Sequence, residues 1–291
     1  MKSFEQLKIH LQQRRIKKRV AVVCPHDECS REALRMASEA GFASPLVFDG
    51  ESHEEVCREA VLAVRRGEAD VLMKGLVNTD VLLRAILDKE EGLLPRGEVL
   101  THVTCAELPD TEHRGEDCGK QDAPGRLLLF TDAAVLPYPT DEQRVAQLRC
   151  VLQVARSLGI GQPRVSLVNC SEKVAPKAFP FTLHYRQLCE EAVAGRFGPC
   201  IVDGPLDLKT SLSPEALRKK GLSSPVGGRA DALVFPDIQA GNVFYKTLTL
   251  FGCETAGMLC GTVAPVVLPS RGDSAYSKLA SLMLAIAYKQ T

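Results

Sequence analysis

The sequence predicts an α/β protein, with two α/β domains built on largely parallel sheets. Short, apolar, β-branched runs alternate with helical patterns from one end of the chain to the other. The joins between them are mostly short, which favours parallel strands with helices covering the faces of each sheet. The length of 291 residues and the hydrophobic content of 45% supply enough material for one large or two smaller cores.

In the first part of the chain, each expected strand is a short apolar run, and each expected helix has apolar residues three or four positions apart. The N-terminal helix shows this spacing at Phe4, Leu7 and Leu11. Strands are expected at 19–24, 45–49, 70–73, 99–108 and 126–130, and the later helices at 28–41, 53–66 and 78–91. The polar segment 109–125 is too long for a tight hairpin, so we expect an exposed loop there.

The alternation continues after a proline-containing segment, 136–140, which we interpret as a domain hinge. Strands are expected at 164–169, 199–202, 230–235, 255–261 and 265–268, and helices at 141–158, 181–196, 214–221, 237–251 and 273–288. The last of these helices carries Leu279, Leu282, Met283 and Ile286 on one face. No internal repeat or low-complexity tract interrupts the pattern.

Charge and hydropathy argue against several classes of partner. Lys plus Arg and Asp plus Glu both total 36, so no net field indicates binding to nucleic acid or to an acidic membrane. The basic segment 1–20 lacks the continuous apolar stretch of a signal peptide. No later run approaches the roughly 18–20 apolar residues of a membrane span. We therefore expect a cytoplasmic protein without a membrane partner.

The motifs favour neither a metal centre nor a covalent catalyst. The 11 cysteines are odd in number and contain no C-x-x-C pair, so we interpret them as scattered structural thiols. The 6 histidines form no metal-binding pair. P-loop, Rossmann and nucleophile-elbow motifs are also absent. The expected chemistry is therefore between two bound substrates that the protein holds and polarises, with no metal.

Polar residues follow the ends of several expected strands, where open parallel sheets bind their ligands. Each of them alone could equally cap a helix. Together they bring cations to one edge of a sheet, which favours a bound anion. The candidate site residues are Lys74, Thr79 and Arg84 after strand 70–73, Asp132 after 126–130, Asn242 after 230–235, and Ser270, Arg271 and Asp273 after the last strand.

The segment 264–277 gives the clearest of these signals, because a strand stops at a proline and a helical pattern follows within a few residues. Arg271 offers a planar fork suited to phosphate or carboxylate, and the backbone N–H groups at a helix start also favour an anion. Asp273 could either cap the helix or accept a proton.

Four segments resemble the phosphate acetyl/butyryltransferase family, and the resemblance extends from about residue 20 to the C-terminus. They are 73–84 (MKGLVNTDVLLR), 203–207 (DGPLD), 223–242 (SSPVGGRADALVFPDIQAGN) and 264–273 (APVVLPSRGD). The segments 171–176 (SEKVAP) and 270–274 (SRGDS) are more similar to the butyryl branch than to the acetyl branch.

The resemblance implies reversible transfer of an acyl group, butyryl or a similar short or branched chain, between coenzyme A and phosphate. The thiolate would attack the acyl phosphate directly in a ternary complex, with coenzyme A as a substrate and no cofactor. The implied architecture is similar to the isocitrate/isopropylmalate dehydrogenases, with the active site in an interdomain cleft. Its domains would be 1–137 with 262–291, and 138–261. A homodimer or larger homo-oligomer is also implied.

Carried over by motif, the resemblance places Ser270 and Arg271 at the acyl phosphate and identifies Arg84 as the arginine borne on a helix. One departure concerns the base that activates the thiol. The acetyl branch has a carboxylate six residues after the arginine, whereas this sequence has Ser277. Asp273 is then the nearest substitute, while Lys74 and other strand-end residues bind substrate.

Three alternatives stay open. The chain could use acetyl-CoA as a phosphate acetyltransferase, or it could be a non-catalytic, coenzyme A-binding regulatory protein. A decarboxylating dehydrogenase of related fold would need a set of metal-binding aspartates and a nicotinamide site.

Overall fold

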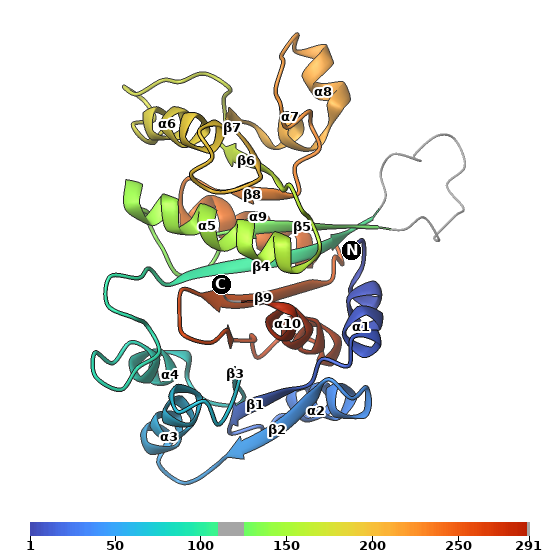
Figure 1. Ribbon diagram of the computed structural model, residues 1–291, viewed down its shortest axis with the longest axis vertical. Coiled ribbons are helices and arrows are strands. Elements are labelled where there is room, and N and C mark those ends of the chain that lie inside the picture. Colours follow the sequence, from blue (N-terminus) through green and yellow to red (C-terminus); the bar gives the residue numbers. More distant parts are fainter. Residues whose placement is uncertain (110–124, 290–291) are drawn as a thin grey trace. The chain divides into compact units, whose positions relative to one another are not determined.

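The computed structural model describes residues 1–109 and 125–289. Their contacts divide the chain into two compact units (Figure 1). Unit 1 is Met1–Leu100 with Glu254–Thr291, and unit 2 is Thr101–Cys253. Strands and helices alternate in both units, and the predicted α/β fold with largely parallel sheets is confirmed. The expected loop at 109–125 lies almost wholly outside the described residues.

In unit 1 the strand order is β2-β1-β3-β10-β9. The bounds are β1 Lys18–Val23, β2 Ala43–Phe48, β3 Val71–Lys74, β9 Thr255–Cys260 and β10 Val266–Val267. The pairs β1–β2, β1–β3 and β3–β10 are parallel, whereas β9 is antiparallel to β10. The ends of β1, β3 and β10 therefore share one edge of the sheet with the start of β9.

The helices of unit 1 are α1 Phe4–Gln13, α2 Glu28–Glu39, α3 His53–Arg65, α4 Thr79–Ile86 and α10 Ala275–Ala287. The sequence predicts one apolar face for the last helix, but every residue from Lys278 to Ala287 is buried. The reason is that α10 packs against α1 and α2 as well as against β9 and β10. Helix α4 is shorter than predicted, because Asp88 accepts hydrogen bonds from the N–H groups of Glu90 and Glu91 and forms a turn.

In unit 2 the strand order is β4-β5-β8-β6-β7. The strands are β4 Thr101–Leu108, β5 Arg126–Thr131, β6 Arg164–Val168, β7 Ile201–Leu206 and β8 Ala232–Val234. The helices are α5 Asp141–Ser157, α6 Phe181–Val193, α7 Leu208–Leu212, α8 Pro214–Lys219 and α9 Ile238–Leu250. Only β4–β5 is antiparallel among the pairs β4–β5, β5–β8, β6–β7 and β6–β8. Short helix α7 was not predicted from the sequence.

The core of unit 2 is built around aromatic side chains from β5, α9 and the end of β8. The Phe130 ring lies edge-on to Phe235 and Phe244, with ring centroids 6.2 and 5.2 Å apart. The unit boundary differs from the expected bounds of 1–137 with 262–291 and 138–261. Strands β4 and β5 belong to unit 2 because β5 pairs with β8 there.

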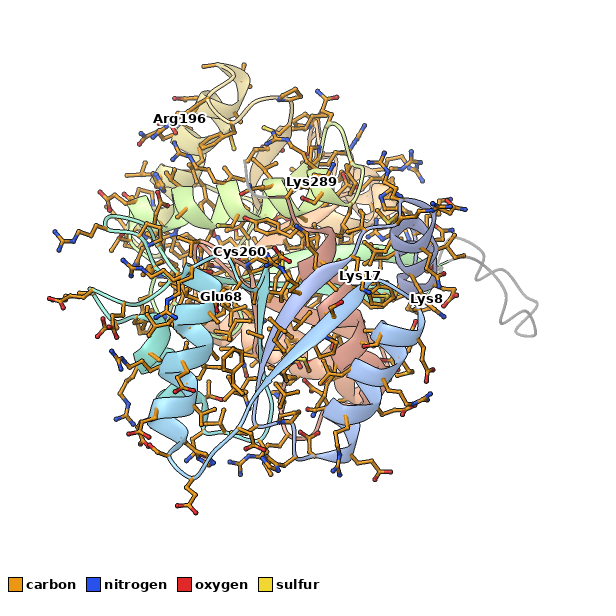
Figure 2. The ribbon with its side chains drawn as sticks, turned by 60° about the horizontal axis from the view of Figure 1, so that its bottom comes forward. Lys8, Lys17, Glu68, Arg196, Cys260 and Lys289 are labelled. Atoms are coloured by element: carbon orange, nitrogen blue, oxygen red, sulfur yellow. The ribbon has the colours of Figure 1, made fainter. Side chains whose placement is uncertain are left out.

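No disulfide joins the cysteines of the described residues. Cys260, labelled in Figure 2, is almost fully buried at the end of β9. Within 1–109 and 125–289, no helix combines the length and the apolar character needed to cross a membrane.

Candidate active site

The turn after β10 is closed by Asp273. Its Oδ2 atom accepts a hydrogen bond from the Ser270 N–H at 2.7 Å, and its own N–H donates to the Ser270 carbonyl at 3.2 Å. The N-cap of α10 is Ser274, whose Oγ accepts from the Ser277 N–H at 3.0 Å. Asp273 is therefore neither the N-cap of α10 nor a residue of that helix. Its carboxylate instead accepts the hydrogen bond that closes the preceding turn.

Arg271 ties this turn to the start of α4. Its Nη2 atom donates to the Asn78 Oδ1 at 2.8 Å. Asn78 is the N-cap residue of α4, yet its side chain makes no capping hydrogen bond. The N–H groups of the first turn of α4, where Thr79 is exposed, thus have no side-chain cap. Two groups that favour anions, a guanidinium and a helix N-terminus, meet here.

Lys74 adds a buried positive charge at the end of β3. Its side chain is only 3% exposed, and its Nζ donates to the carbonyls of Gly75 and Val77 at 3.1 and 3.2 Å. None of the described carboxylates forms an ion pair with it. Burial lowers the pKa of Lys74, the positive charges of Arg271 and Lys278 lower it further, and the more weakly acting carboxylates of Asp27 and Asp273 offset part of this. An anion bound here would supply the missing negative charge.

A second buried lysine has its own counter-ion. Lys278, on α10, donates to the Asp27 Oδ1 at 2.6 Å and to the Ser30 Oγ at 3.0 Å. Partial burial by itself raises the pKa of the Asp27 carboxyl, but the hydrogen bonds from Lys278 and Ser30 outweigh this and hold it at about 2. This pair joins α10 to the N-terminus of α2, and it leaves Lys74 as the buried ammonium without a carboxylate among the described residues.

Replacing Asp27 by Asn should destabilise the protein in a pH-dependent way. The Asp27 pKa falls from 3.8 to about 2 on folding. Its charge therefore contributes about 2 kcal/mol of stability above pH 4, and this is lost as the pH falls from 4 to 2. Urea unfolding should give a free energy of unfolding about 2 kcal/mol lower for Asp27→Asn than for the wild type at pH 7, and this difference should disappear near pH 2.

The matched control for this pair is the double variant Asp27→Asn/Lys278→Met. It leaves no unpaired buried charge, so it should be more stable at pH 7 than Asp27→Asn alone. A gap between wild type and Asp27→Asn that stayed constant from pH 7 to pH 2 would contradict the ion-pair account.

Arg84 lies apart from these contacts in the structure. Its guanidinium pairs with Asp80 on the same helix at 2.8 Å, and its side chain is 72% exposed. It borders a cavity of about 240 Å³ between α3 and α4. No described contact joins it to Arg271. The substrate-binding role of Arg84 stays a prediction.

Asp132 and Asn242 belong to unit 2, where their hydrogen bonds join the turn after β5 to β4 and to the start of α9. The two Asp132 carboxylate oxygens accept four hydrogen bonds, from the Thr101 hydroxyl and three backbone N–H groups, at 2.7–2.9 Å. Asn242 donates to the Ala133 carbonyl at 2.9 Å, and Gly241 leaves no room for a Cβ beside the Asp132 carbonyl. Asp132 therefore holds this turn in place, and the substrate-binding roles of Asp132 and Asn242 stay predictions.

One carboxylate near the turn was missed in the sequence. Glu254 precedes β9, and its Oε2 accepts a hydrogen bond from the Ser277 hydroxyl at 2.9 Å. The signal for it was present: the join between strands 255–261 and 265–268 is too short for a parallel crossover. The two strands must therefore be antiparallel, which brings the residue before the first strand to the edge where the second strand ends.

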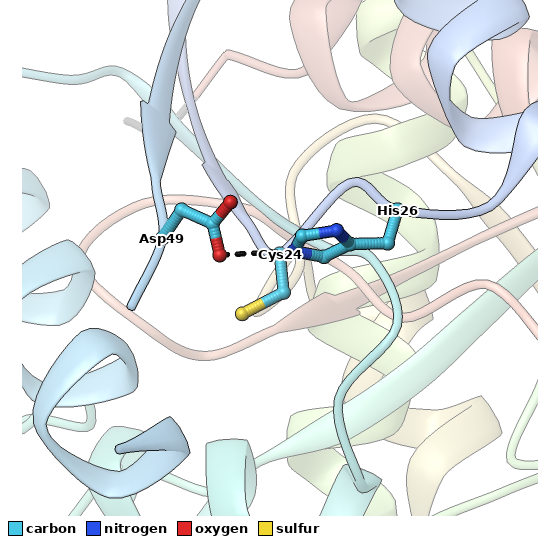
Figure 3. A group of neighbouring side chains, drawn as sticks. All are labelled: Cys24, His26 and Asp49. Atoms are coloured by element: carbon cyan, nitrogen blue, oxygen red, sulfur yellow. Dashed lines mark hydrogen bonds and ion pairs between the residues drawn. The ribbon is translucent and has the colours of Figure 1, made fainter. Parts of the chain in front are cut away.

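Cys24, His26 and Asp49 form the one group of described side chains that could hold a metal ion (Figure 3). Their ligand atoms all lie within 4.8 Å of one another. The parallel register of β1 and β2 explains the approach of Cys24 to Asp49, since Val23 pairs with Phe48. His26 and Asp49 already satisfy each other at 2.9 Å, and both are about half exposed. Spacing along the sequence did not reveal this group.

Comparisons with known proteins show which family the chain belongs to. The family model described as "Phosphate acetyl/butaryl transferase" matches residues 47–286. The phosphate butyryltransferase of Clostridium acetobutylicum is 35% identical over 98% of this chain and 97% of its own length. The phosphate acetyltransferase of Thermotoga maritima is 36% identical over 91% of this chain and 84% of its own.

A solved structure is similar over almost the same extent. The branched-chain phosphotransacylase from Enterococcus faecalis V583 superimposes with a TM-score of 0.80 at 30% identity, over 93% of this chain and 98% of that one. The family match covers most of the chain, and the relatives match it nearly end to end. The chain therefore belongs to the phosphate acetyl/butyryl transferase family and is an acyltransferase enzyme.

Proposed function

We propose that the protein transfers an acyl group reversibly between coenzyme A and inorganic phosphate, at a site formed by Lys74, Arg271 and the start of α4. The observation that carries the proposal is the buried Lys74 ammonium, which has no carboxylate partner among the described residues and lies in the positive field of Arg271. Phosphate, or the phosphoryl group of an acyl phosphate, is the anion that this environment favours.

The residues have distinct tasks in this reaction. Arg271 binds the phosphate oxygens through its guanidinium fork, and Lys74 acts on them as a point charge. The Ser270 hydroxyl stabilises the oxyanion that forms on the acyl carbonyl when the thiolate attacks. The carbon–sulfur bond forms as the carbon–oxygen bond to phosphate breaks, and the phosphate leaves with the electron pair. In this displacement the thiolate of coenzyme A is the nucleophile, so no side chain of the enzyme becomes acylated, and no metal is assigned a role.

We also propose roles for the remaining candidate residues, an oligomeric state and an acyl preference. Thr79 and Arg84 would contact substrate from α4, while Asp132 and Asn242 would position a segment of unit 2. A cytoplasmic enzyme that forms homodimers or larger assemblies is in keeping with the resemblance. A butyryl or branched acyl group is supported by the names of similar proteins, although an acetyltransferase is among them.

A panel of acyl-CoA substrates from acetyl to branched five-carbon chains tests the function directly. The purified protein should release free thiol from butyryl-CoA or a branched homologue only when phosphate is present, and faster than from acetyl-CoA. A higher rate with acetyl-CoA would support the acetyltransferase alternative. Calorimetric binding of coenzyme A without phosphate-dependent thiol release would overturn the proposal in favour of a non-catalytic protein.

A further inference from the structure

The carboxylates near the turn differ in what already occupies them. Asp273 accepts the Ser270 N–H, Asp27 pairs with Lys278, and Asp80 pairs with Arg84. Glu254 differs from them in its donor, which is a side-chain hydroxyl rather than a backbone N–H or a cation. It is exposed, and its Oε2 atom accepts the Ser277 hydroxyl hydrogen bond at 2.9 Å, along which a proton can pass.

The position of this pair fits a reacting thiol. Ser277 is in the first turn of α10, and its Oγ also lies 3.2 Å from that of the N-cap residue Ser274. Backbone N–H groups at a helix start lower the pKa of a nearby thiol by stabilising the thiolate. Glu254 comes to the same edge of the sheet as Ser270 because β9 is antiparallel to β10.

We propose that Ser277 and Glu254 form a relay that takes the proton from the thiol of coenzyme A; this rests on the proposed function. The sulfur–hydrogen bond breaks as the proton passes to the Ser277 Oγ, whose own proton passes to Glu254. The thiolate then attacks the acyl carbon, phosphate leaves, and Glu254 releases its proton to water. Ser277 is the catalytic residue of the pair, and Glu254 acts through it as a positioning and proton-accepting residue.

The charged groups on the elements packed against β9 do not compete for this role. On α10, Lys278 points to Asp27, and in the turn after β10 Arg271 points to Asn78. Asp273 uses one carboxylate oxygen to close that turn. The donor to Asp273 is a backbone N–H, which passes on no proton, so we assign the role of base to Glu254 and expect Asp273→Asn to act through the shape of the turn.

The test is the pH profile of kcat/KM for coenzyme A, with butyryl phosphate as the acyl donor. A thiol with an ordinary pKa near 8.5 is about 3% thiolate at pH 7, so losing the base costs up to about thirtyfold there. The loss should shrink to about twofold at pH 8.5, where the thiol ionises unaided. Glu254→Gln and Ser277→Ala should both show this profile, and the double variant should be no worse than either.

Controls separate the relay from a structural effect. Glu68→Gln, an exposed glutamate of unit 1 (Figure 2), should keep the wild-type profile. Asp273→Asn should lower kcat/KM for coenzyme A by the same factor at every pH. In Ser277→Asp/Glu254→Gln, a carboxylate placed directly on α10 should restore the rate at pH 7. A loss in Glu254→Gln that does not change with pH would overturn the relay, and an inactive wild type would overturn the proposed function and the relay with it.

Discussion

Arg271→Ala should lower kcat by at least ~10²–10³ in both directions. The guanidinium would be the main bidentate ligand of the phosphoryl group, and the transition state places more charge on the oxygens it binds than the ground state does. Truncation also frees the Asn78 side chain to cap α4, which would close the helix N-terminus to an anion. Steady-state kinetics with butyryl-CoA and phosphate, and with butyryl phosphate and coenzyme A, measure the effect.

Two further variants make this result specific. Arg271→Lys keeps the charge but loses the planar fork, so it should recover only part of the activity. Arg35→Ala removes an exposed arginine of α2 that pairs with Glu32 and Glu39 on the same helix, and it should leave kcat unchanged. An Arg271→Ala enzyme with wild-type kcat would show that the anion binds elsewhere.

The sequence predicts the elements of this fold well because the local signals agree with one another. The spacing of Phe4, Leu7 and Leu11 predicts α1, and all three side chains are fully buried. The apolar runs also locate every strand found within residues 1–109 and 125–289. What fails is at the ends: the pattern extends the helix after Asn78 to residue 91, whereas α4 stops at Ile86. Asp88 ends it through hydrogen bonds that hydrophobic spacing does not report.

The sequence predicts a candidate site residue only where a charged or polar side chain directly follows an expected strand. Lys74 and Arg271 are predicted by that rule, and the positive charge of Arg271 lowers the pKa of Lys74 in the structure, while their role in binding substrate stays a prediction. Residue types alone cannot say which carboxylates are already occupied. Asp273 appears free in the sequence but closes a turn, while Glu254 precedes a strand and meets Ser277 only through antiparallel pairing.

Lys74→Met should lower kcat/KM for phosphate by roughly 10- to 150-fold, which corresponds to the about 1.5–3 kcal/mol of a hydrogen bond with a charged partner. Methionine has a similar length and fits an apolar site, so the fold is kept. Phosphate at about 100 times its Kd should stabilise the wild type by about 2.7 kcal/mol in thermal unfolding. That shift should be largely lost in Lys74→Met. Lys219→Met, which removes an exposed lysine paired with Glu215, should keep both the activity and the shift.

The pH dependence of stability separates a charge effect at Lys74 from a packing effect. Folding lowers the pKa of Lys74 from its usual 10.5, so unfolding takes up a proton between the two values. Stability therefore rises with pH in that window in the wild type, and Lys74→Met removes that contribution. Bound phosphate favours the charged form and raises the pKa of Lys74, so saturation with phosphate should flatten the wild-type slope. If the difference in Tm between the two proteins did not change with pH, with or without phosphate, Lys74 would not be the buried charge that the anion neutralises.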